Sequence, residues 1–179
     1  FTTSAQYCEP TTEDVLGPFY KPDTSKNDHI CMRYQNHTFL PKITMTGHIK
    51  NVDCEPVNGV KVEIWQTDDE GKYHNDQTCR GYVVSENNGS FSFETIHPGR
   101  YKLGDHFRPS HIHMLFTKPG YHNLITQIYF EGDQYLGEND GCPPAICHSD
   151  DQRRIIGLKK VLSSKNFEGT FEVVLENRI

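Results

Sequence analysis

The sequence predicts an all-β protein: a β-sandwich core with a loop-rich N-terminal segment and one short late helix. Short stretches of alternating apolar and polar residues recur along the chain, which is the pattern of strands that bury one face. Turn signals such as Asn-Gly and Pro-Gly separate these stretches, and only one late segment has the spacing of a helix. With 179 residues and no internal repeat, we expect a single domain over residues 1–179.

The expected elements follow a simple order along the chain. Residues 1–42 are weakly periodic and contain Pro and Asn, so we expect a loop-rich lead-in. Residues 43–136 should form the β-sandwich that carries the functional site, and residues 137–179 a cysteine loop, a helix and a closing strand. Alternation predicts the strands, which lie at residues 43–49, 60–65, 91–93, 110–117, 124–131 and 170–176.

The single expected helix covers about residues 150–162. Ser149 is a suitable N-cap, and Asp150 and Asp151 lie in the first turn, where acidic side chains stabilise a helix. The apolar residues of the segment fall on one helical face: Ile155, Leu158, Val161 and Leu162.

Composition and charge exclude two classes of partner. The formal net charge is −6 and the chain contains no run of Lys and Arg, which argues against nucleic acid. No stretch approaches the ~18–20 apolar residues of a membrane span. We therefore expect neither nucleic acid nor a membrane as a partner.

Six cysteines indicate a secreted, disulfide-bonded chain: Cys8, Cys31, Cys54, Cys79, Cys142 and Cys147. Two Asn-x-Ser/Thr triplets, at 36–38 and 88–90, point the same way, and the chain begins at Phe1, which fits removal of a leader. The sequence leaves all of the possible pairings open. The alternative is a thiolate metal site at residues 142–148, although no second cysteine pair has matching spacing.

Two histidines separated by one residue, His111 and His113, are the first candidate for chemistry. In an extended strand, residues i and i+2 point to the same side, so both imidazoles can reach one metal ion. Ile112 and Met114 then point the other way and suit the core. The spacing alone is equally consistent with two ordinary strand histidines.

Two tyrosines share a local setting, because Gly-Lys precedes Tyr73 and Gly-Arg precedes Tyr101. Each ends a turn at the edge of a strand. A phenol has a pKa of ~10, and its phenolate is a hard anionic oxygen that needs a strong Lewis acid such as Fe³⁺ at neutral pH. The chain has nine tyrosines, so by composition alone these two would be strand-end tyrosines with solvated hydroxyls.

Seven segments, in order from about residue 10 to 136, resemble the intradiol ring-cleavage dioxygenases, the catechol and protocatechuate 3,4-dioxygenase group. They are Gly-Pro-Phe-Tyr at 17–20, Val-Glu-Ile-Trp-Gln at 62–66, Gly-Lys-Tyr at 71–73, Gly-Ser-Phe-Ser-Phe-Glu-Thr-Ile at 89–96, Pro-Gly-Arg-Tyr at 98–101, Arg-Pro-Ser-His-Ile-His at 108–113 and Leu-Ile-Thr-Gln-Ile-Tyr-Phe at 124–130. Transthyretin-like carrier domains share the strand pattern. The order Tyr, Tyr, Arg-Pro-x-His-x-His is far more specific.

The resemblance implies a non-haem Fe(III) ion with four ligands: Tyr73, Tyr101, His111 and His113. Such an enzyme cleaves the ring of a catechol between its two hydroxylated carbons with O2 and gives a cis,cis-muconate-type product. Tyr101 would leave the metal when substrate binds and take up a substrate proton. Two phenolates and a hydroxide would balance the ferric charge, so the centre could be buried at low desolvation cost.

The resemblance and the strand pattern also suggest the residues around the metal. Arg108 would stabilise the charge that develops on the substrate ring, with a structural salt bridge as the alternative. Gln127 would reach the pocket as a hydrogen-bonding group. Val15, Gly17 and Pro18 would form a pocket wall, with an ordinary loop as the alternative.

Two departures from the family lead to further expectations. There is no room before residue 17 for the helical N-terminal region through which catechol-type enzymes form dimers, so we expect a monomer. The cysteine content is nearer the secreted single-domain members. The stretch between Tyr101 and Arg108 is short, which should leave the pocket open to substituted catechols.

Three other histidines lie near the candidate ligands: His74, His97 and His106. We expect these three side chains to be mostly solvated. The alternative to an enzyme is a secreted transthyretin-like carrier whose histidines form a non-catalytic metal site.

Overall fold

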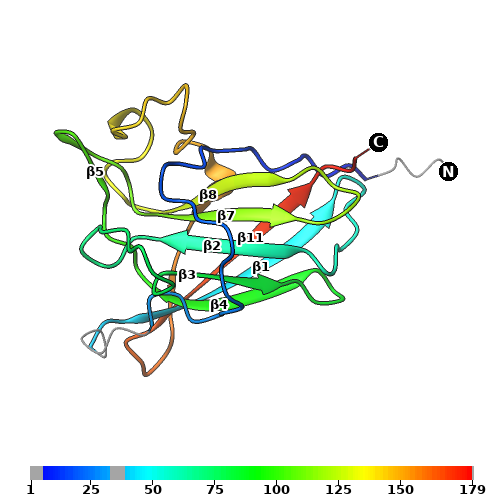
Figure 1. The fold of residues 1–179 in the computed structure, drawn as a ribbon, viewed down its shortest axis with the longest axis horizontal. Helices are drawn as coiled ribbons and strands as arrows, with labels where there is room; N and C mark the ends of the chain where they lie inside the picture. The colour runs from blue at the N-terminus through cyan, green and yellow to red at the C-terminus, as the bar shows by residue number, and fades with distance from the viewer. Residues whose placement is uncertain (1–5, 33–38, 179) are drawn as a thin grey trace.

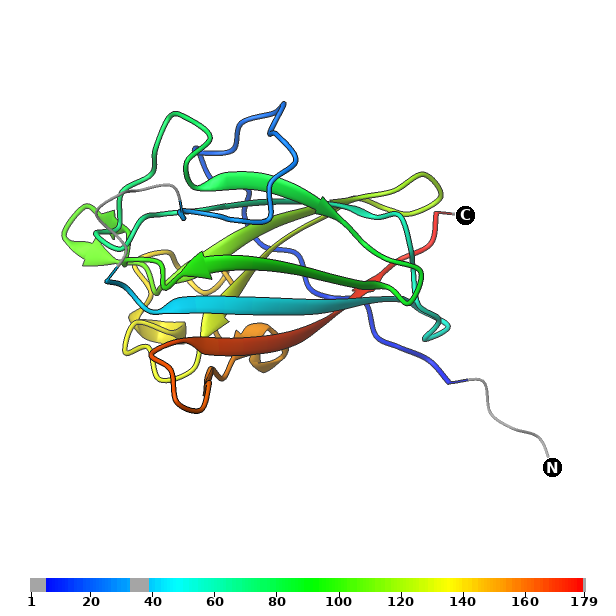
Figure 2. The ribbon, with the colours of Figure 1, turned by 90° about the horizontal axis from the view of Figure 1, so that it is seen from below.

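The structure, a computed structural model, describes residues 6–32 and 39–178. Two sheets lie face to face and form a β-sandwich (Figures 1 and 2). The strand order is β10-β11-β1-β4 in the first sheet and β3-β2-β7-β8-β9 in the second. The predicted all-β class and the β-sandwich are therefore confirmed.

The described residues form eleven strands and two short 3₁₀ turns. The first sheet contains β1 (Lys42–Asn51), β4 (Ser90–Ile96), β10 (Lys159–Lys160) and β11 (Phe167–Leu175). The second contains β2 (Lys61–Gln66), β3 (Arg80–Val84), β7 (His111–Thr117), β8 (Leu124–Phe130) and β9 (Ile155–Ile156). β5 (Lys102–Leu103) and β6 (His106–Phe107) form a separate hairpin at the end of the sandwich opposite the C-terminus (Figure 1). The 3₁₀ turns are η2 (Gly137–Asn139) and η3 (Gln152–Arg154).

The core lies between the two sheets, because each sheet turns one row of apolar side chains inward. Burial alternates along the whole of β1, as the sequence pattern predicts. The main inward residues are Ile43, Met45, Ile49, Phe91, Phe93, Phe171 and Val173 on the first sheet, and Val62, Ile64, Ile112, Met114, Phe116 and Ile128 on the second. Ile112 and Met114 are fully buried there, which leaves their neighbours on β7 to face outward.

The outer face of β7 is covered as well, so six of its seven residues are buried. The lead-in crosses the strands of the second sheet (Figure 1). The backbone N–H of Asp14 donates to the carbonyl of Ile125 at 2.9 Å, which ties the lead-in to β8. The two histidines of β7 therefore lie between the second sheet and this covering segment.

The predicted helix over residues 150–162 is wrong. Only the 3₁₀ turn Gln152–Arg154 forms, with Asp151 as its N-cap rather than Ser149. Ile155 and Ile156 then pair in parallel with β8, and Lys159 and Lys160 pair with β11. β-Branched Ile-Ile suits a strand, and pairing with existing sheet edges outweighs a weak helical pattern.

All six cysteines form disulfides, in the pairs Cys8–Cys54, Cys31–Cys79 and Cys142–Cys147. The alternative thiolate metal site at residues 142–148 is therefore wrong. The triplet at 88–90 forms a turn in which Asn88 Oδ1 accepts from the backbone N–H of Ser90 at 3.0 Å, whereas the triplet at 36–38 lies outside the described residues. Over residues 6–32 and 39–178, no helix is long and apolar enough to cross a membrane.

Candidate active site

Three side chains meet on the outer face of β7. The hydroxyl of Tyr73 lies 3.2 Å from Nε2 of His111 and 2.9 Å from Nε2 of His113, and the two Nε2 atoms are 3.2 Å apart. Both imidazoles are 3% exposed. The predicted convergence of the two histidines is present, and the structure adds Tyr73 to the same point.

The donor set fits a transition-metal ion. Donor atoms about 2.0–2.1 Å from one ion lie roughly 3 Å from each other, as the three atoms here do. Nδ1 of His111 donates to the carbonyl of Pro109 at 2.7 Å, so its Nε2 presents a lone pair. Nε2 of His113 points into the same cluster, and its ring stacks on Trp65 at 4.9 Å.

Tyrosine is the further side chain near the two histidines that could bind a metal ion. Within the described part of the chain, no three His, Cys, Asp or Glu side chains are grouped as a metal site. Tyr101 lies beside the cluster, with its ring 5.6 Å from that of Tyr73. Two imidazoles and two phenols favour a ferric ion over zinc, which is usually bound by Cys, His or carboxylate.

Paired glycines bring the two tyrosine segments together. A Cβ on Gly71 would lie 2.2 Å from the carbonyl oxygen of Arg100, and one on Gly99 would lie 2.2 Å from the backbone nitrogen of Gly71. Gly71 also has a φ of +83°, which suits glycine. The matching Gly-x-Tyr settings in the sequence are therefore two segments packed against each other, which is why both tyrosines reach one site.

The β5–β6 hairpin places Tyr101 beside Arg108. The hairpin consists of residues 102–107, so the two residues flank its base. The backbone N–H of Arg108 donates to the carbonyl of Tyr101 at 2.8 Å. The short stretch between Tyr101 and Arg108 is thus a hairpin, in which Leu103, the last residue of β5, is 43% exposed.

A pocket of about 140 Å³ opens onto the cluster. Its lining residues are Val15, Gly17, Pro18, Phe19, Tyr73, Tyr101, Leu103, Arg108, His111, His113, Cys142 and Cys147. The predicted wall at Val15, Gly17 and Pro18 is thus in place, and a Cβ on Gly17 would lie 3.4 Å from Cε1 of His113. Gln127 is fully buried and lies behind the lining, where its Nε2 donates to the carbonyl of Val15 at 2.8 Å.

Arg108 is held rigidly in the pocket wall. Nε and Nη2 donate to the two carboxylate oxygens of Asp140 at 3.0 and 3.1 Å. Nη1 donates to Gln127 at 3.0 Å, and Nη2 also donates to the hydroxyl of Tyr129 at 3.1 Å. Tyr129 in turn donates to Asp14 at 2.7 Å, and Asp14 pairs with Arg154. The salt bridge that the sequence left open as an alternative exists, but Arg108 still faces the pocket.

Burial shifts the protonation of the cluster. It lowers the pKa of His111 to about 4 and the pKa of His113 well below that of a free imidazole, with nearby positive charge as a further cause. It also raises the pKa of Tyr73 above its usual range. Burial opposes the charge of Arg108, but its bonds to Asp140 and Tyr129 hold its pKa above the usual value. Without a metal, the cluster is therefore neutral at pH 7.

The metal-free protein is expected to lose stability as the pH falls from about 7 to 4. The folded state holds His111 with a lowered pKa, so the unfolded state binds more protons in this range. At about 1.4 kcal/mol per pKa unit, this group alone removes ~3 kcal/mol of the free energy of unfolding. Urea unfolding at pH 7 and 4.5 measures the loss. A free energy that stays constant over this interval would contradict the buried, neutral imidazoles.

The three further candidate histidines, His74, His97 and His106, do not join the cluster. His97 and His106 are exposed, as predicted. The prediction that His74 is solvated is wrong, because its Nε2 lies 2.7 Å from a carboxylate oxygen of Asp68 and its side chain is only 13% exposed. His74 thus contacts Asp68 rather than the cluster that Tyr73 joins.

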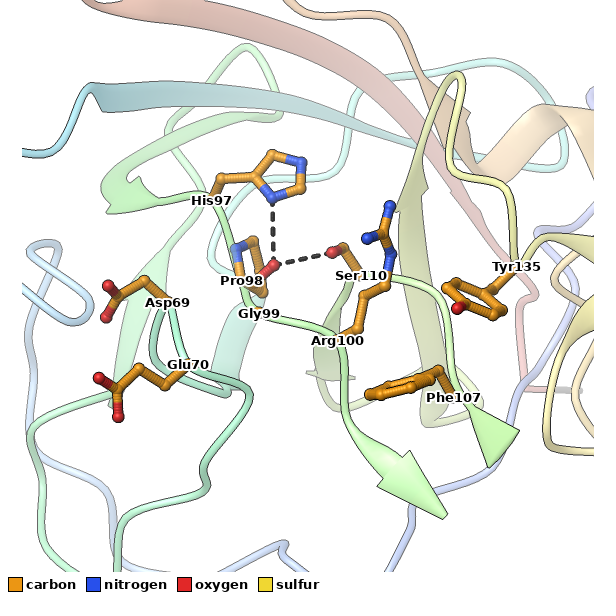
Figure 3. Close-up of a pocket in the computed structure, with 9 residues that line it drawn as sticks. All are labelled: Asp69, Glu70, His97, Pro98, Gly99, Arg100, Phe107, Ser110 and Tyr135. Atoms are coloured by element: carbon orange, nitrogen blue, oxygen red, sulfur yellow. Dashed lines mark hydrogen bonds between the residues drawn. The ribbon is translucent and has the colours of Figure 1, made fainter. Parts of the chain in front are cut away.

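A second, larger cavity of about 440 Å³ is lined in part by Pro98, Gly99 and Arg100, the residues that precede Tyr101 (Figure 3). Asp69 and Glu70 lie at one side of it and Phe107 and Tyr135 at the other (Figure 3). Oγ of Ser110 donates to the carbonyl of Pro98 here, away from the cluster of Tyr73, His111 and His113. None of the tyrosines and histidines of the cluster lines this cavity.

Several residues of the site are not evident from the sequence. Phe19 stacks on Tyr73 with ring centroids 4.2 Å apart, and its position after Gly17-Pro18 was the one available signal. Asp14 and Asp140 are 126 positions apart and have no shared local pattern. Their common role follows only from the folded chain.

The chain is similar in sequence to known dioxygenases. A dioxygenase family model matches residues 15–177. Among curated relatives, a chlorocatechol 1,2-dioxygenase of Rhodococcus opacus is 32% identical over 74% of this chain and 60% of its own length, and a catechol 1,2-dioxygenase of Candida albicans is 30% identical over 72% and 50%. The chain thus spans only about half to three fifths of the length of these relatives.

Solved structures show the same fold. A 3-chlorocatechol 1,2-dioxygenase from Rhodococcus opacus 1CP superposes with a TM-score of 0.82 at 22% identity, covering 94% of this chain and 73% of that one. The dioxygenase domain of a dioxygenase–carbohydrate-binding fusion from Streptomyces sp. SirexAA-E superposes with a TM-score of 0.79 at 29% identity and is covered completely. These matches favour an enzyme over a transthyretin-like carrier. The chain belongs to the intradiol ring-cleavage dioxygenase family.

Proposed function

We propose that this protein is a non-haem Fe(III) intradiol dioxygenase that cleaves catechols with O2 to cis,cis-muconate-type products. The observation that carries the proposal is the meeting of Tyr73, His111 and His113 within 2.9–3.2 Å of one another in a pocket shared with Tyr101 and Arg108. The relatives named as catechol and chlorocatechol 1,2-dioxygenases support it.

The donor chemistry assigns a role to each ligand. Tyr73, Tyr101, His111 and His113 would hold the iron, which when bound supplies a Lewis acid that fixes both catechol oxygens and draws electron density from the ring. The hydroxyl of Tyr101 makes no hydrogen bond to any other described residue, whereas that of Tyr73 contacts both histidines. Tyr101 is therefore the tyrosine freer to leave and to accept a substrate proton at its oxygen.

The remaining side chains bind and orient the substrate. Arg108 directs a fixed positive charge at the pocket, where it can stabilise negative charge that develops on the ring. Phe19, Pro18 and Leu103 make the walls apolar, which suits an aromatic ring. We also propose that the protein works outside the reducing cytoplasm, and its three disulfides support this.

Removal and replacement of the metal test the proposal. Treatment with a ferric chelator should reduce catechol-dependent O2 uptake to background, and added iron should restore it, whereas Zn²⁺ should not, because zinc has no redox chemistry. 4-Methylcatechol should also be consumed, because the pocket mouth at Leu103 is open to solvent. An oxygen electrode measures all four conditions. Full uptake by iron-free protein would contradict the proposal.

A further inference from the structure

Asp140 is the buried carboxylate behind the pocket wall. Its side chain is fully buried and that of Arg108 is 6% exposed, so the pair is shielded from water. Oδ1 of Asp140 also accepts from the backbone N–H of Cys142 at 2.9 Å, at the start of the loop that the Cys142–Cys147 disulfide closes. The next residue, Gly141, donates to the carbonyl of Phe107 at 2.9 Å. Asp140 is therefore fixed from both sides, directly beside the chain segment that leads into Arg108.

The hydrogen bonds of Arg108 leave one donor for the pocket. A guanidinium group has five N–H groups. Nε donates to Asp140, and Nη2 donates to Asp140 and Tyr129, which uses three of them. Nη1 donates one to Gln127. The orientation of the remaining N–H of Nη1 is thus set by the bidentate contact with Asp140.

The same contact offsets the charge of Arg108. Among the described residues that line the pocket, Arg108 is the only Lys, Arg, Asp or Glu side chain. Because its charge is matched by Asp140 at hydrogen-bond distance in a buried setting, the pocket offers an anionic substituent little net attraction. The rest of the wall is largely apolar, with Val15, Phe19 and Leu103.

We propose that Asp140 is a positioning and specificity-determining residue: it orients Arg108 through the bidentate pair and neutralises it, so that the site selects uncharged catechols over carboxylated ones. The proposal rests on the proposed function for the identity of the substrate. Asp140 would offset the charge of Arg108 even if the pocket only bound ligands, so the role of Asp140 and the proposed function can be tested separately.

The first experiment measures binding by titration calorimetry with the protein as purified. Benzoate and benzamide have nearly the same shape and differ in charge. Asp140→Asn should bind benzoate at least tenfold more tightly than the unchanged protein does, and its affinity for benzamide should change less than threefold. The reason is that the buried charge of Arg108, no longer matched by Asp140, attracts a carboxylate in the pocket by about 1.4 kcal/mol or more. A ratio of benzoate to benzamide affinity that stays within twofold in a folded variant would overturn the proposal.

The second experiment measures turnover of catechol and 3,4-dihydroxybenzoate. Asp140→Asn should lower kcat/KM for catechol about 10- to 100-fold and raise the preference for 3,4-dihydroxybenzoate relative to catechol about tenfold. Asp140→Glu keeps the charge but displaces Arg108. It should lower kcat by a similar factor while keeping the original preference. A purely structural role for Asp140 would change the rates for both substrates equally and contradict the proposal.

The control variant is Asp133→Asn. Asp133 is also a buried carboxylate paired with an arginine, since Nε of Arg100 lies 3.2 Å from each of its oxygens, but this pair lies outside the metal pocket. Asp133→Asn should leave unchanged both the ratio of benzoate to benzamide affinity and the preference for 3,4-dihydroxybenzoate relative to catechol. If Asp140→Asn does not fold, Asp140→Ser removes the same charge in a smaller side chain and takes its place. Absence of catechol turnover by the unchanged protein would overturn the proposed function, and the benzoate result would still decide the role of Asp140.

Discussion

Replacement of His111 by alanine is expected to abolish iron binding and, with it, catechol turnover. Its Nε2 lies 3.2 Å from both of the other donor atoms, and its Nδ1 is already committed to Pro109. Loss of a residue that only orients a metal ligand typically reduces affinity or activity by about 10–100-fold, so loss of a ligand should exceed that range. Iron content by mass spectrometry and O2 uptake measure the two effects.

His106→Ala is the matched control for this variant. His106 lies on the β5–β6 hairpin, is exposed and is not part of the cluster, so its removal should leave the iron content unchanged. A folded His111→Ala protein that retained one iron per chain would exclude His111 as a ligand.

Replacement of Tyr101 by phenylalanine should slow turnover by about 10²–10⁴-fold, the usual contribution of a group that transfers a proton. Ferric phenolate also gives a red-brown absorption band, so both Tyr101→Phe and Tyr73→Phe should shift the visible spectrum of the iron-loaded protein. Since Tyr73 contacts both histidines, Tyr73→Phe should in addition weaken iron binding.

Tyr135→Phe is the control for the tyrosine variants. Tyr135 lines the second cavity and lies outside the metal pocket, so neither the spectrum nor the rate should change. An unchanged visible spectrum in both Tyr73→Phe and Tyr101→Phe would rule out the four-ligand site.

The strands of the core could be predicted because alternation is a local signal that the sandwich needs. β1, β4, β7 and β8 each show it and lie where the sequence places them, within a few residues. β3 was missed, since it is short and contains Gly81. The sequence also could not predict which strand pairs with β11, because that strand is β1, which lies more than 120 residues earlier and runs parallel to β11.

The prediction of a helix over residues 150–162 was also wrong because of contacts between distant parts of the chain. The supposed apolar face of residues 150–162 includes Leu162, which is 92% exposed, and Val161, which is 38% exposed. Ile156 is buried and pairs with Phe130 at the edge of the second sheet. A helical spacing in a short segment does not reveal whether a sheet edge is available nearby, and here the tertiary contact prevails.

The meeting of the candidate ligands could be expected from the sequence, but the polar network behind them could not. His111 and His113 follow from strand alternation, and the two tyrosines follow from motif order. Asp14 and Asp140 come from loops at opposite ends of the chain and meet at Tyr129 and Arg108. No spacing rule connects such residues, so only the fold shows that Arg108 pairs with Asp140.

The identity of the product tests the central claim most directly. Iron-loaded protein incubated with catechol and O2 should give cis,cis-muconate, with one O2 consumed per catechol, as followed by ultraviolet absorbance and an oxygen electrode in the same sample. Cleavage outside the two hydroxylated carbons would instead give a yellow semialdehyde. That product, or the absence of any ring-opened product from protein with a full complement of iron, would contradict an intradiol centre built from Tyr73, Tyr101, His111 and His113.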